Sequence, residues 1–363
     1  MTVARAAVLS EAGGAFSVED VTLPALGPGQ VRVRLAATGV CHSDLSLADG
    51  TMAAEFPVVL GHEGAGRVVE VGPGVSGLSV GDPVLLNWAP ACRRCWYCER
   101  GEPYLCPEAM RAWQHPYATL AGGDRVYQGL GTAAFGTETV VDADACVPLP
   151  RDIPLDEAAL LGCAVLTGVG AVVNAAKVQP GESVLIVGLG GVGLCAVQGA
   201  RIAGAGQVIT VDPSRSKAEL AHRLGATETL EPSDKLAGIV RGLTEGRGVD
   251  HAIECVGRAE TIRGAWSATR RGGRTTVVGM GARGDKLAFN ALELAYWGRT
   301  LAGCMFGSSD PAADLPALIE HYRAGRLDLA ALVSDRIGLD QIGQAFEAMR
   351  AGRGARSLVV FDD

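Results

Sequence analysis

The sequence predicts an α/β protein of two domains, one rich in β-structure and one built on a doubly wound parallel sheet. The first third of the chain combines β-rich stretches with Gly and Pro turns and contains no long helical pattern. From about Gly181, short apolar strands alternate with helical segments, an order that builds a parallel sheet covered by helices on both faces. The length of 363 residues also favours about two domains.

In the first region the expected strands include QVRVRLAATGV (30–40), EGAGRVVEVG (63–72) and DPVLLNWA (82–89). The opening segment, MTVARAAVLSEAGG, predicts a strand and a turn, because it lacks the long apolar core and the cleavage site of a signal peptide. A cytoplasmic protein is the resulting expectation.

The second region begins with the apolar strand SVLIVG (183–188), followed by a helix over 190–205 and the strand QVITVD (207–212). The next helix has Ser214 as its expected N-cap and Gly225 at its end. The alternation then continues through the segments 250–255, 260–272, 273–280 and 299–307. Two amphipathic helices and the strand SLVVF close the chain, and periodicity does not settle which domain this tail joins.

Composition excludes several function classes. The net charge of −8 and the lack of a Lys/Arg block leave no basic footprint for a nucleic-acid backbone, so no nucleic-acid partner is expected. No apolar run is long enough to span a membrane. Without an export signal, the ten cysteines are better interpreted as metal ligands or reduced thiols than as disulfides. Buried structural thiols are expected at Cys146, Cys195, Cys255 and Cys304.

Four cysteines lie close together in PACRRCWYCERGEPYLCPE, at Cys92, Cys95, Cys98 and Cys106. Two-residue gaps let successive thiolates in a tight turn face one point, and four thiolates complete a tetrahedral zinc site with no open position. An iron–sulfur cluster fits less well, because the last gap is seven residues long. A zinc ribbon that grips nucleic acid is the alternative from another class, and the acidic balance argues against it.

A second set of metal-binding residue types comes from the separate segments GVCHSD, GHEGAG and LLGCAV, which supply Cys41, His62, Glu63 and Cys163. Dispersed ligands on a rigid scaffold are typical of a catalytic metal site. Three protein ligands leave a fourth position for water or substrate.

The segment GLGGVG predicts a dinucleotide site, because it follows an expected strand and opens an expected helix. Its backbone would receive the pyrophosphate at the helix N-terminus. Asp212 ends the next strand and can accept hydrogen bonds from ribose hydroxyls while repelling a 2′-phosphate, so NAD is favoured over NADP. Arg215 and Lys217 lie close enough in sequence to touch the adenosine end. The loop residues are Gly188, Gly190, Gly191, Val192 and Gly193.

Together these segments resemble the zinc-dependent medium-chain alcohol dehydrogenases, whose signature G-H-E-x-x-G reads GHEGAG here. The likeness covers nearly the whole chain. It implies that Cys41, His62 and Cys163 hold a catalytic zinc, in addition to the structural zinc of the four-cysteine segment. It also implies that Glu63 can approach the metal transiently and that Asp44 orients His62.

The resemblance assigns further roles around the reaction, in which hydride passes from the alcohol carbon to NAD beside the zinc. His42 and Arg356 fall at positions that contact the pyrophosphate, and His42 replaces an arginine common there. The Ser43 hydroxyl resembles the first station of a proton relay. Ser46 stands where many relatives carry the relay histidine, so water is the expected substitute.

The substrate wall implied by the resemblance is apolar, as a hydrophobic alcohol requires. Glycine stands at position 129, where relatives often carry a bulky side chain, so a pocket relieved there would admit an aromatic or medium-length primary alcohol. The residues expected to face the substrate are Trp88, Gly129, Leu130, Met280 and Met305.

Two other functions fit parts of the same pattern. Some segments also resemble the mycothiol- or glutathione-dependent formaldehyde dehydrogenases, which oxidise an S-hydroxymethyl thiol, and Arg111 is the candidate anchor for the carboxylate of such a thiol. A non-catalytic protein that binds zinc and NAD is disfavoured, because both halves of the reaction site are intact. A zinc-free quinone reductase is disfavoured by the complete ligand set.

The resemblance also implies domain limits and assembly. Residues 1–164 and 306–363 are expected to form a GroES-like catalytic domain, and residues 165–305 a Rossmann domain that binds NAD. A homodimer is expected, with a tetramer as the alternative.

Overall fold

The computed structural model describes residues 2–361, which form two compact units. Unit 1 contains the chain up to Cys163 and the segment from Val333 onward, and unit 2 is Ala164–Leu332. The chain therefore returns to unit 1 at Val333 and not at residue 306. The short helix η7 (Phe306–Ser308) packs against α4 (Ala164–Gly170), which keeps the segment after residue 306 in unit 2.

Unit 1 is built from β-structure, as the alternating first third of the sequence predicts. A closed barrel has the strand order β1 (Thr2–Leu9), β2 (Phe16–Leu23), β7 (Pro116–Thr119), β8 (Arg125–Gln128) and β4 (Val58–Val59). The register of β1 against β2 is antiparallel along their whole length.

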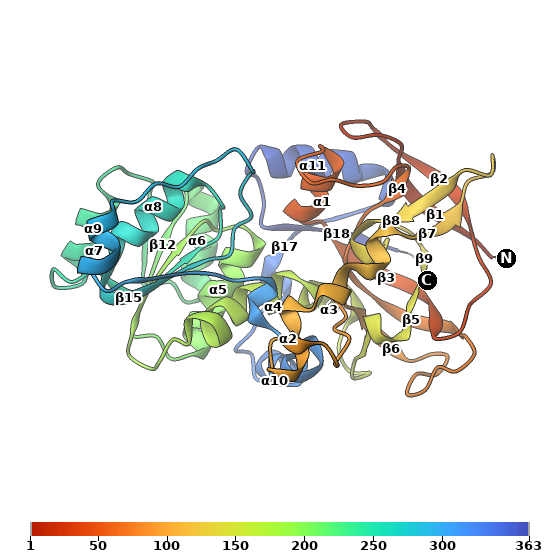
Figure 1. Cartoon of the computed structure of the whole chain (residues 1–363), viewed down its shortest axis with the longest axis horizontal. Helices are drawn as coiled ribbons and strands as arrows, with labels where there is room; N and C mark the ends of the chain where they lie inside the picture. Colours follow the sequence, from red (N-terminus) through yellow and green to blue (C-terminus); the bar gives the residue numbers. More distant parts are fainter. Residues whose placement is uncertain (1, 362–363) are drawn as a thin grey trace. The chain divides into compact units, whose positions relative to one another are not determined.

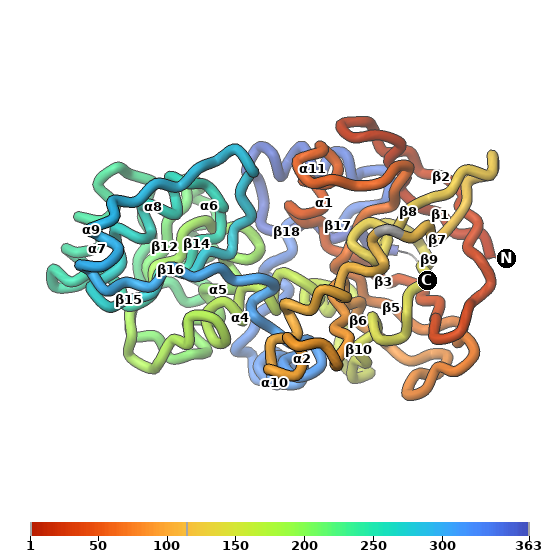
Figure 2. The backbone as a smooth tube through the Cα atoms, in the orientation of Figure 1, coloured from red at the N-terminus to blue at the C-terminus, as the bar shows by residue number. Residues whose placement is uncertain are grey.

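A seven-stranded sheet forms the rest of the unit 1 scaffold. Its order is β10 (Cys146–Pro148), β6 (Pro83–Leu86), β5 (Glu63–Val71), β3 (Gln30–Gly39), β18 (Arg356–Val360) and β17 (Val333–Ile337), and β9 (Glu138–Asp142) also pairs with β3. Alternate residues Val31, Val33 and Leu35 of β3 enter its core. The strand β18 runs antiparallel to β3, so residues 358–360 lie beside residues 37–39 (Figure 2).

The helices of unit 1 are short. They are α1 (His42–Ala48), α2 (Trp96–Glu99), α3 (Leu155–Ala158) and α11 (Ile342–Arg350), with 3₁₀ turns η1 (Pro103–Leu105), η2 (Pro107–Gln114), η3 (Gly129–Gly131), η4 (Ala143–Ala145), η5 (Ala159–Gly162) and η9 (Leu339–Gln341). Because most of these elements are a turn or two long, tertiary packing must hold them.

Unit 2 carries a six-stranded sheet in which every neighbouring pair is parallel. The strand order is β13 (Glu228–Leu230), β12 (Gln207–Val211), β11 (Ser183–Val187), β14 (Val249–Glu254), β15 (Thr269–Val277) and β16 (Thr300–Gly303). This order reverses direction at β11, which is the doubly wound arrangement that the alternation predicts.

Helices cover both faces of this sheet, as the ribbon shows (Figure 1). Leu185 and Val187 pack with residues of α7 and α8, whereas Ile186, one residue apart, points toward α5. The helices of unit 2 are α4, a π-helical segment η6 (Ala171–Ala176), α5 (Gly191–Ile202), α6 (Arg215–Leu224), α7 (Leu236–Leu243), α8 (Ala259–Ala268), α9 (Ala291–Tyr296), α10 (Pro311–Arg323) and η8 (Ala330–Leu332). Ser214 at the start of α6 and Gly225 at its end are confirmed as cap residues.

Within residues 2–361, no single helix is long and apolar enough to cross a bilayer. One bent pair, Leu155–Gly162 with Ala164–Ala176, passes by length and composition together. Most of its residues are buried.

Candidate metal centres and dinucleotide site

The dispersed ligand types meet at one point of unit 1. Donor atoms of Cys41, His62, Glu63 and Cys163 all lie within 4.8 Å of one another, and all four side chains are buried. Cys41 follows β3 and precedes α1, His62 comes directly before β5, Glu63 begins β5, and Cys163 follows η5. Two thiols, one imidazole and a nearby carboxylate form a donor set that suits Zn²⁺.

Asp44 fixes the geometry of this cluster. One of its carboxylate oxygens accepts hydrogen bonds from the Gly61 N–H at 2.9 Å and from Nδ1 of His62 at 3.1 Å, and the other accepts from the Cys41 N–H at 3.1 Å. Although burial opposes a charged imidazole, Asp44 raises the pKa of His62. Because Nδ1 is engaged, Nε2 is left as the metal-binding nitrogen.

Glu63 and Arg356 form a second buried pair beside the cluster. The Arg356 guanidinium lies 3.4 Å from the Glu63 carboxylate and donates a hydrogen bond to the Val40 carbonyl at 2.8 Å. Burial raises the pKa of Glu63 to about 7, against the attraction of Arg356. A Cβ added at Gly39 would lie 2.1 Å from a Glu63 carboxylate oxygen, so glycine there makes room for that side chain.

The family resemblance places Arg356 at the pyrophosphate and gives no sign of its pairing with Glu63. Arg356 is 5% exposed, and its hydrogen bond to Val40 joins residues 316 positions apart. Only the pairing of β18 with β3 brings them together, so no local sequence signal could have found the contact. Any contact of Arg356 with the cofactor stays a prediction.

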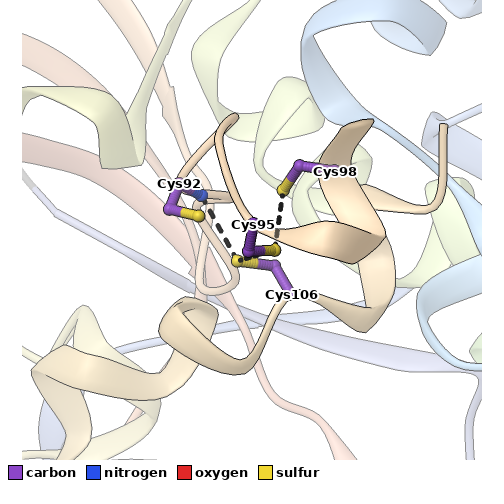
Figure 3. A group of neighbouring side chains, drawn as sticks. All are labelled: Cys92, Cys95, Cys98 and Cys106. Atoms are coloured by element: carbon purple, nitrogen blue, oxygen red, sulfur yellow. Dashed lines mark hydrogen bonds between the residues drawn. The ribbon is translucent and has the colours of Figure 1, made fainter. Parts of the chain in front are cut away.

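The four clustered cysteines converge as their spacing predicts (Figure 3). The sulfur atoms of Cys95 and Cys98 lie 3.5 Å apart, and those of Cys95 and Cys106 lie 3.8 Å apart. Cys95 is the N-cap of α2, so Cys98 falls one helical turn later. A hydrogen bond from the Arg94 backbone N–H lowers the pKa of Cys92 to about 7. Four convergent cysteine sulfur atoms suit a closed tetrahedral zinc.

The glycine segment forms the turn between β11 and α5. Gly188 has φ +90°, and a Cβ at Gly193 would lie 1.8 Å from the Gly188 carbonyl oxygen, so both positions require glycine. Gly190 caps the helix that begins at Gly191, with Val192 in its first turn. The backbone N–H groups at that end are the kind that binds a pyrophosphate.

Asp212 follows β12 and ties this loop in place. Its carboxylate accepts hydrogen bonds from the Leu189 N–H at 2.7 Å and the Ser214 N–H at 2.9 Å. A carboxylate has further lone pairs that ribose hydroxyls can use. Arg215 is almost fully exposed and pairs with Glu219, and Lys217 is half-buried.

Helix α1 also carries the three residues predicted for pyrophosphate binding and proton transfer. His42 is exposed, and both Ser43 and Ser46 are half-buried. The roles of these three residues in cofactor binding and proton transfer stay predictions.

Two tryptophans extend from the metal cluster. The Trp88 ring meets the His62 ring edge-on at 6.1 Å between centroids, and the Trp113 ring lies 6.0 Å from Trp88. Trp88 was expected at the substrate wall, but Trp113 was not. Trp113 lies in η2, which packs on η3, and its contact with Trp88 joins residues of different elements, so the local sequence does not reveal it.

Packing around Gly129 is close, and its position at the substrate wall stays a prediction. A Cβ at this position would lie 2.7 Å from the Val59 carbonyl oxygen and 2.7 Å from a Leu60 methyl group, so close packing requires the glycine. Leu130 beside it is buried, at 3% exposure. Met280 and Met305 lie in unit 2, where each is exposed, and their position at the substrate wall stays a prediction.

Arg111 is held inside unit 1 by acidic neighbours. Its guanidinium lies 2.6 Å from Asp144 and 3.3 Å from Asp142, and it also donates to the Glu108 carbonyl at 3.3 Å. These partners already occupy the guanidinium N–H groups with which Arg111 would bind the carboxylate of a thiol substrate.

Comparison with known families finds two matching models. The model described as the alcohol dehydrogenase GroES-like domain matches residues 27–151, and the model described as a zinc-binding dehydrogenase matches residues 191–323. The two matches fall in the two units.

Relatives of full length are also found. An S-(hydroxymethyl)glutathione dehydrogenase of Synechocystis is 38% identical over 98% of this chain and 99% of its own length. An alcohol dehydrogenase zinc-binding domain protein from Burkholderia ambifaria has a TM-score of 0.94 at 33% identity, over 100% of both chains. The benzyl alcohol dehydrogenase of Acinetobacter calcoaceticus has a TM-score of 0.92 at 31% identity, over 100% of both chains.

Proposed function

Because this chain belongs to the zinc-dependent medium-chain alcohol dehydrogenase family, we propose that it transfers hydride between NAD and primary alcohols that carry an aromatic group. Enzymatic oxidoreduction with zinc and a nicotinamide cofactor follows from the family. The aromatic substrate is supported by the row of rings formed by His62, Trp88 and Trp113, which begins at the metal cluster. Aromatic walls favour an aromatic ligand through edge-to-face and offset contacts.

The residues of the two centres divide the work. Zinc held by Cys41, His62 and Cys163 would lower the pKa of an alcohol oxygen and so prepare the alcohol for hydride loss to the nicotinamide. Asp44 keeps His62 in the tautomer that leaves Nε2 free for the metal. Ser43 receives the alcohol proton, and solvent near Ser46 carries it away.

Cofactor binding rests on unit 2. The backbone N–H groups after Gly190 hold the pyrophosphate, and the Asp212 carboxylate accepts the ribose hydroxyls. The same carboxylate would repel a 2′-phosphate, which supports NAD over NADP. Arg215 and Lys217 flank the adenosine end.

Oxidation of S-(hydroxymethyl)glutathione is the second candidate, since the relatives at 36–38% identity carry that name. Such a substrate needs a cation for its carboxylates, and Arg111 is already occupied by Asp142 and Asp144. The aromatic alcohol is therefore the function that the geometry of unit 1 supports better. A homodimer remains our expectation for the assembly.

The deciding experiment measures NADH formation by the zinc-loaded protein with benzyl alcohol, ethanol and S-(hydroxymethyl)glutathione. We expect kcat/KM to be highest for benzyl alcohol. In Trp113→Leu, the kcat/KM for benzyl alcohol should fall about tenfold relative to that for ethanol, as expected for lost apolar contact. Trp96→Leu is the matched control, because Trp96 is 62% exposed and lies on α2. Activity with the thiol adduct alone would contradict the proposal.

A further inference from the structure

Unit 2 contains a pocket of about 680 Å³ that the dehydrogenase reaction does not use. Its volume falls in the range of small-molecule sites. It is lined by Arg241, Gly246, Arg247, Ser267, Arg270, Arg271, Glu293, Trp297 and Arg299. Five of these nine residues are arginines, which is an unusual local composition for a chain with a net charge of −8.

The pocket lies away from the dinucleotide loop. Arg247 precedes β14, Arg270 and Arg271 begin β15, and Arg299 precedes β16, so the lining gathers at the amino ends of parallel strands. Gly188 and Asp212 follow the carboxyl ends of β11 and β12 in the same sheet. In a parallel sheet these two ends lie at opposite edges, so the arginine pocket is separate from the cofactor site.

The carboxylates around the pocket are already engaged. Arg263 takes both oxygens of Glu293, at 2.6 and 2.9 Å. Arg270 pairs with Asp250 at 2.5 Å.

A third pair joins Arg247 to Glu245 at 2.5 Å. Among the ion pairs of residues 2–361, none joins Arg241, Arg271 or Arg299 to a carboxylate. Three guanidinium groups of the pocket wall therefore form no ion pair with a carboxylate among the described residues.

Two of these three guanidinium groups are held in place by an indole. Arg271 lies 4.5 Å and Arg299 5.2 Å from the centroid of the Trp297 ring. Arg299 also donates from Nε to the Arg270 carbonyl at 3.3 Å, which leaves its terminal nitrogens for other acceptors. Stacked guanidinium groups lose less freedom when they bind a ligand.

The guanidinium groups around the pocket repel one another. Burial lowers the pKa of Arg299, and repulsion from Arg241 and Arg263 adds to this effect, against the attraction of Glu293. A bound anion would relieve that repulsion. Arg271 and Arg299 already lie over the Trp297 ring, so this ring is not available to stack on an aromatic base. The pocket therefore favours a ligand bound through its negative charge.

We propose that this arginine pocket binds a phosphate-bearing anion of at least two negative charges, for which inorganic pyrophosphate is the simplest representative. Guanidinium forks match phosphate oxygens in geometry and form charge-assisted hydrogen bonds. A ligand held there would bridge α7, the start of β15 and the segment before β16. Occupancy would therefore stabilise unit 2 without competing for NAD.

The test uses calorimetric titration of pyrophosphate into the full-length zinc enzyme saturated with NAD, so that the glycine loop is already filled. The variants are Arg241→Gln and the double variant Arg241→Gln/Arg299→Gln. Arg223→Gln, exposed on α6, is the matched control for charge. We expect the dissociation constant to rise about tenfold in the single variant and further in the double one, because each substitution removes charge-assisted hydrogen bonds to the anion.

The single variant guards against misfolding, because Arg241 is exposed and the one described hydrogen bond of its side chain is long, at 3.4 Å to the Ser267 carbonyl. ADP and citrate, titrated in parallel, separate phosphate recognition from simple charge attraction. Binding of ADP and pyrophosphate but not citrate supports the proposal. Absence of saturable binding to the wild type, equal affinity in all variants, or equal binding of citrate would overturn it.

Discussion

The two cysteine-containing clusters of unit 1 both bring thiols together, but one is built from a single segment and the other from three separate segments. Cys92, Cys95, Cys98 and Cys106 lie within one short segment around α2, whereas the second cluster draws Cys41, His62 and Cys163 from three distant segments. Local spacing assembles the first cluster, and only the folded sheet assembles the second. A contiguous site supports the fold around it, while a dispersed site depends on the fold.

Burial and charge separate the clusters further. Three of the four clustered cysteines are only partly buried. The dispersed set is fully buried and is surrounded by the charged groups of Asp44 and Arg356. A closed set of four thiolates leaves no place for a substrate, whereas the dispersed set can leave one. We therefore expect mutations in the two clusters to affect different properties.

The largest expected effect is the loss of turnover in Cys163→Ala. Removing one ligand of the dispersed cluster should lower zinc content from two to one per chain and reduce kcat about 1000-fold, since metal polarisation contributes several kcal/mol. Zinc analysis of the purified protein and NADH formation measure the two quantities. The melting temperature should change little, because alanine is close to cysteine in size.

Cys146→Ala is the matched control for this experiment. Cys146 is another buried cysteine of unit 1, and burial raises its pKa to about 12, as expected for an inert thiol. This variant should keep both zinc ions and full activity. If Cys163→Ala behaved in the same way, the dispersed cluster would not be the catalytic metal site.

The next effect is on stability. Cys98→Ala should also leave one zinc ion per chain, but it should lower the melting temperature by about 10 °C, because a structural zinc contributes folding energy directly. The protein that stays folded should retain most of its kcat. Loss of turnover equal to that of Cys163→Ala, with an unchanged melting temperature, would remove the distinction between the clusters.

The same contrast explains what the sequence could predict. The alternation after residue 181 predicted the parallel sheet, and the cysteine spacing predicted the contiguous cluster, because both patterns are local. The dispersed ligands could be proposed only through resemblance to a family. Their meeting point depends on the pairing of β3 with β5 and on η5, which no spacing encodes.

The features that the sequence did not predict are contacts between segments that are far apart in the chain. The close packing of Gly129 against Val59 and Leu60, which leaves no room for a side chain, was not visible in the sequence. Neither Trp113 nor the pairing of Arg356 with Glu63 was foreseen, because each contact joins elements that are distant in sequence. The return of the chain to unit 1 was expected too early, because the packing of η7 on α4 is a tertiary contact.

A smaller effect should follow from a substitution that keeps the zinc ligands but removes the carboxylate that orients His62. In Asp44→Asn the amide can still accept from Cys41 or Gly61, but it cannot hold the His62 imidazole as a carboxylate does. Zinc affinity and kcat should each fall 10–100-fold, the range expected for such outer partners. Competition with a chelator measures the affinity. An equal loss of zinc from the four-cysteine cluster would indicate general unfolding instead.

The smallest effect concerns the space around Glu63. Gly39→Ala places a methyl group 2.1 Å from the Glu63 carboxylate, so β3 or that side chain must shift. We expect a loss of about 1–3 kcal/mol in the free energy of unfolding, which lowers the melting temperature by about 2–4 °C per kcal/mol. Gly238→Ala is the matched control, because an added Cβ meets nothing within 4 Å on α7, and it should stabilise the protein by about 0.5–1 kcal/mol. If Gly39→Ala were no less stable than this control, the contact of Glu63 with β3 would not constrain the dispersed cluster. Close packing would then not distinguish the dispersed cluster from the contiguous one.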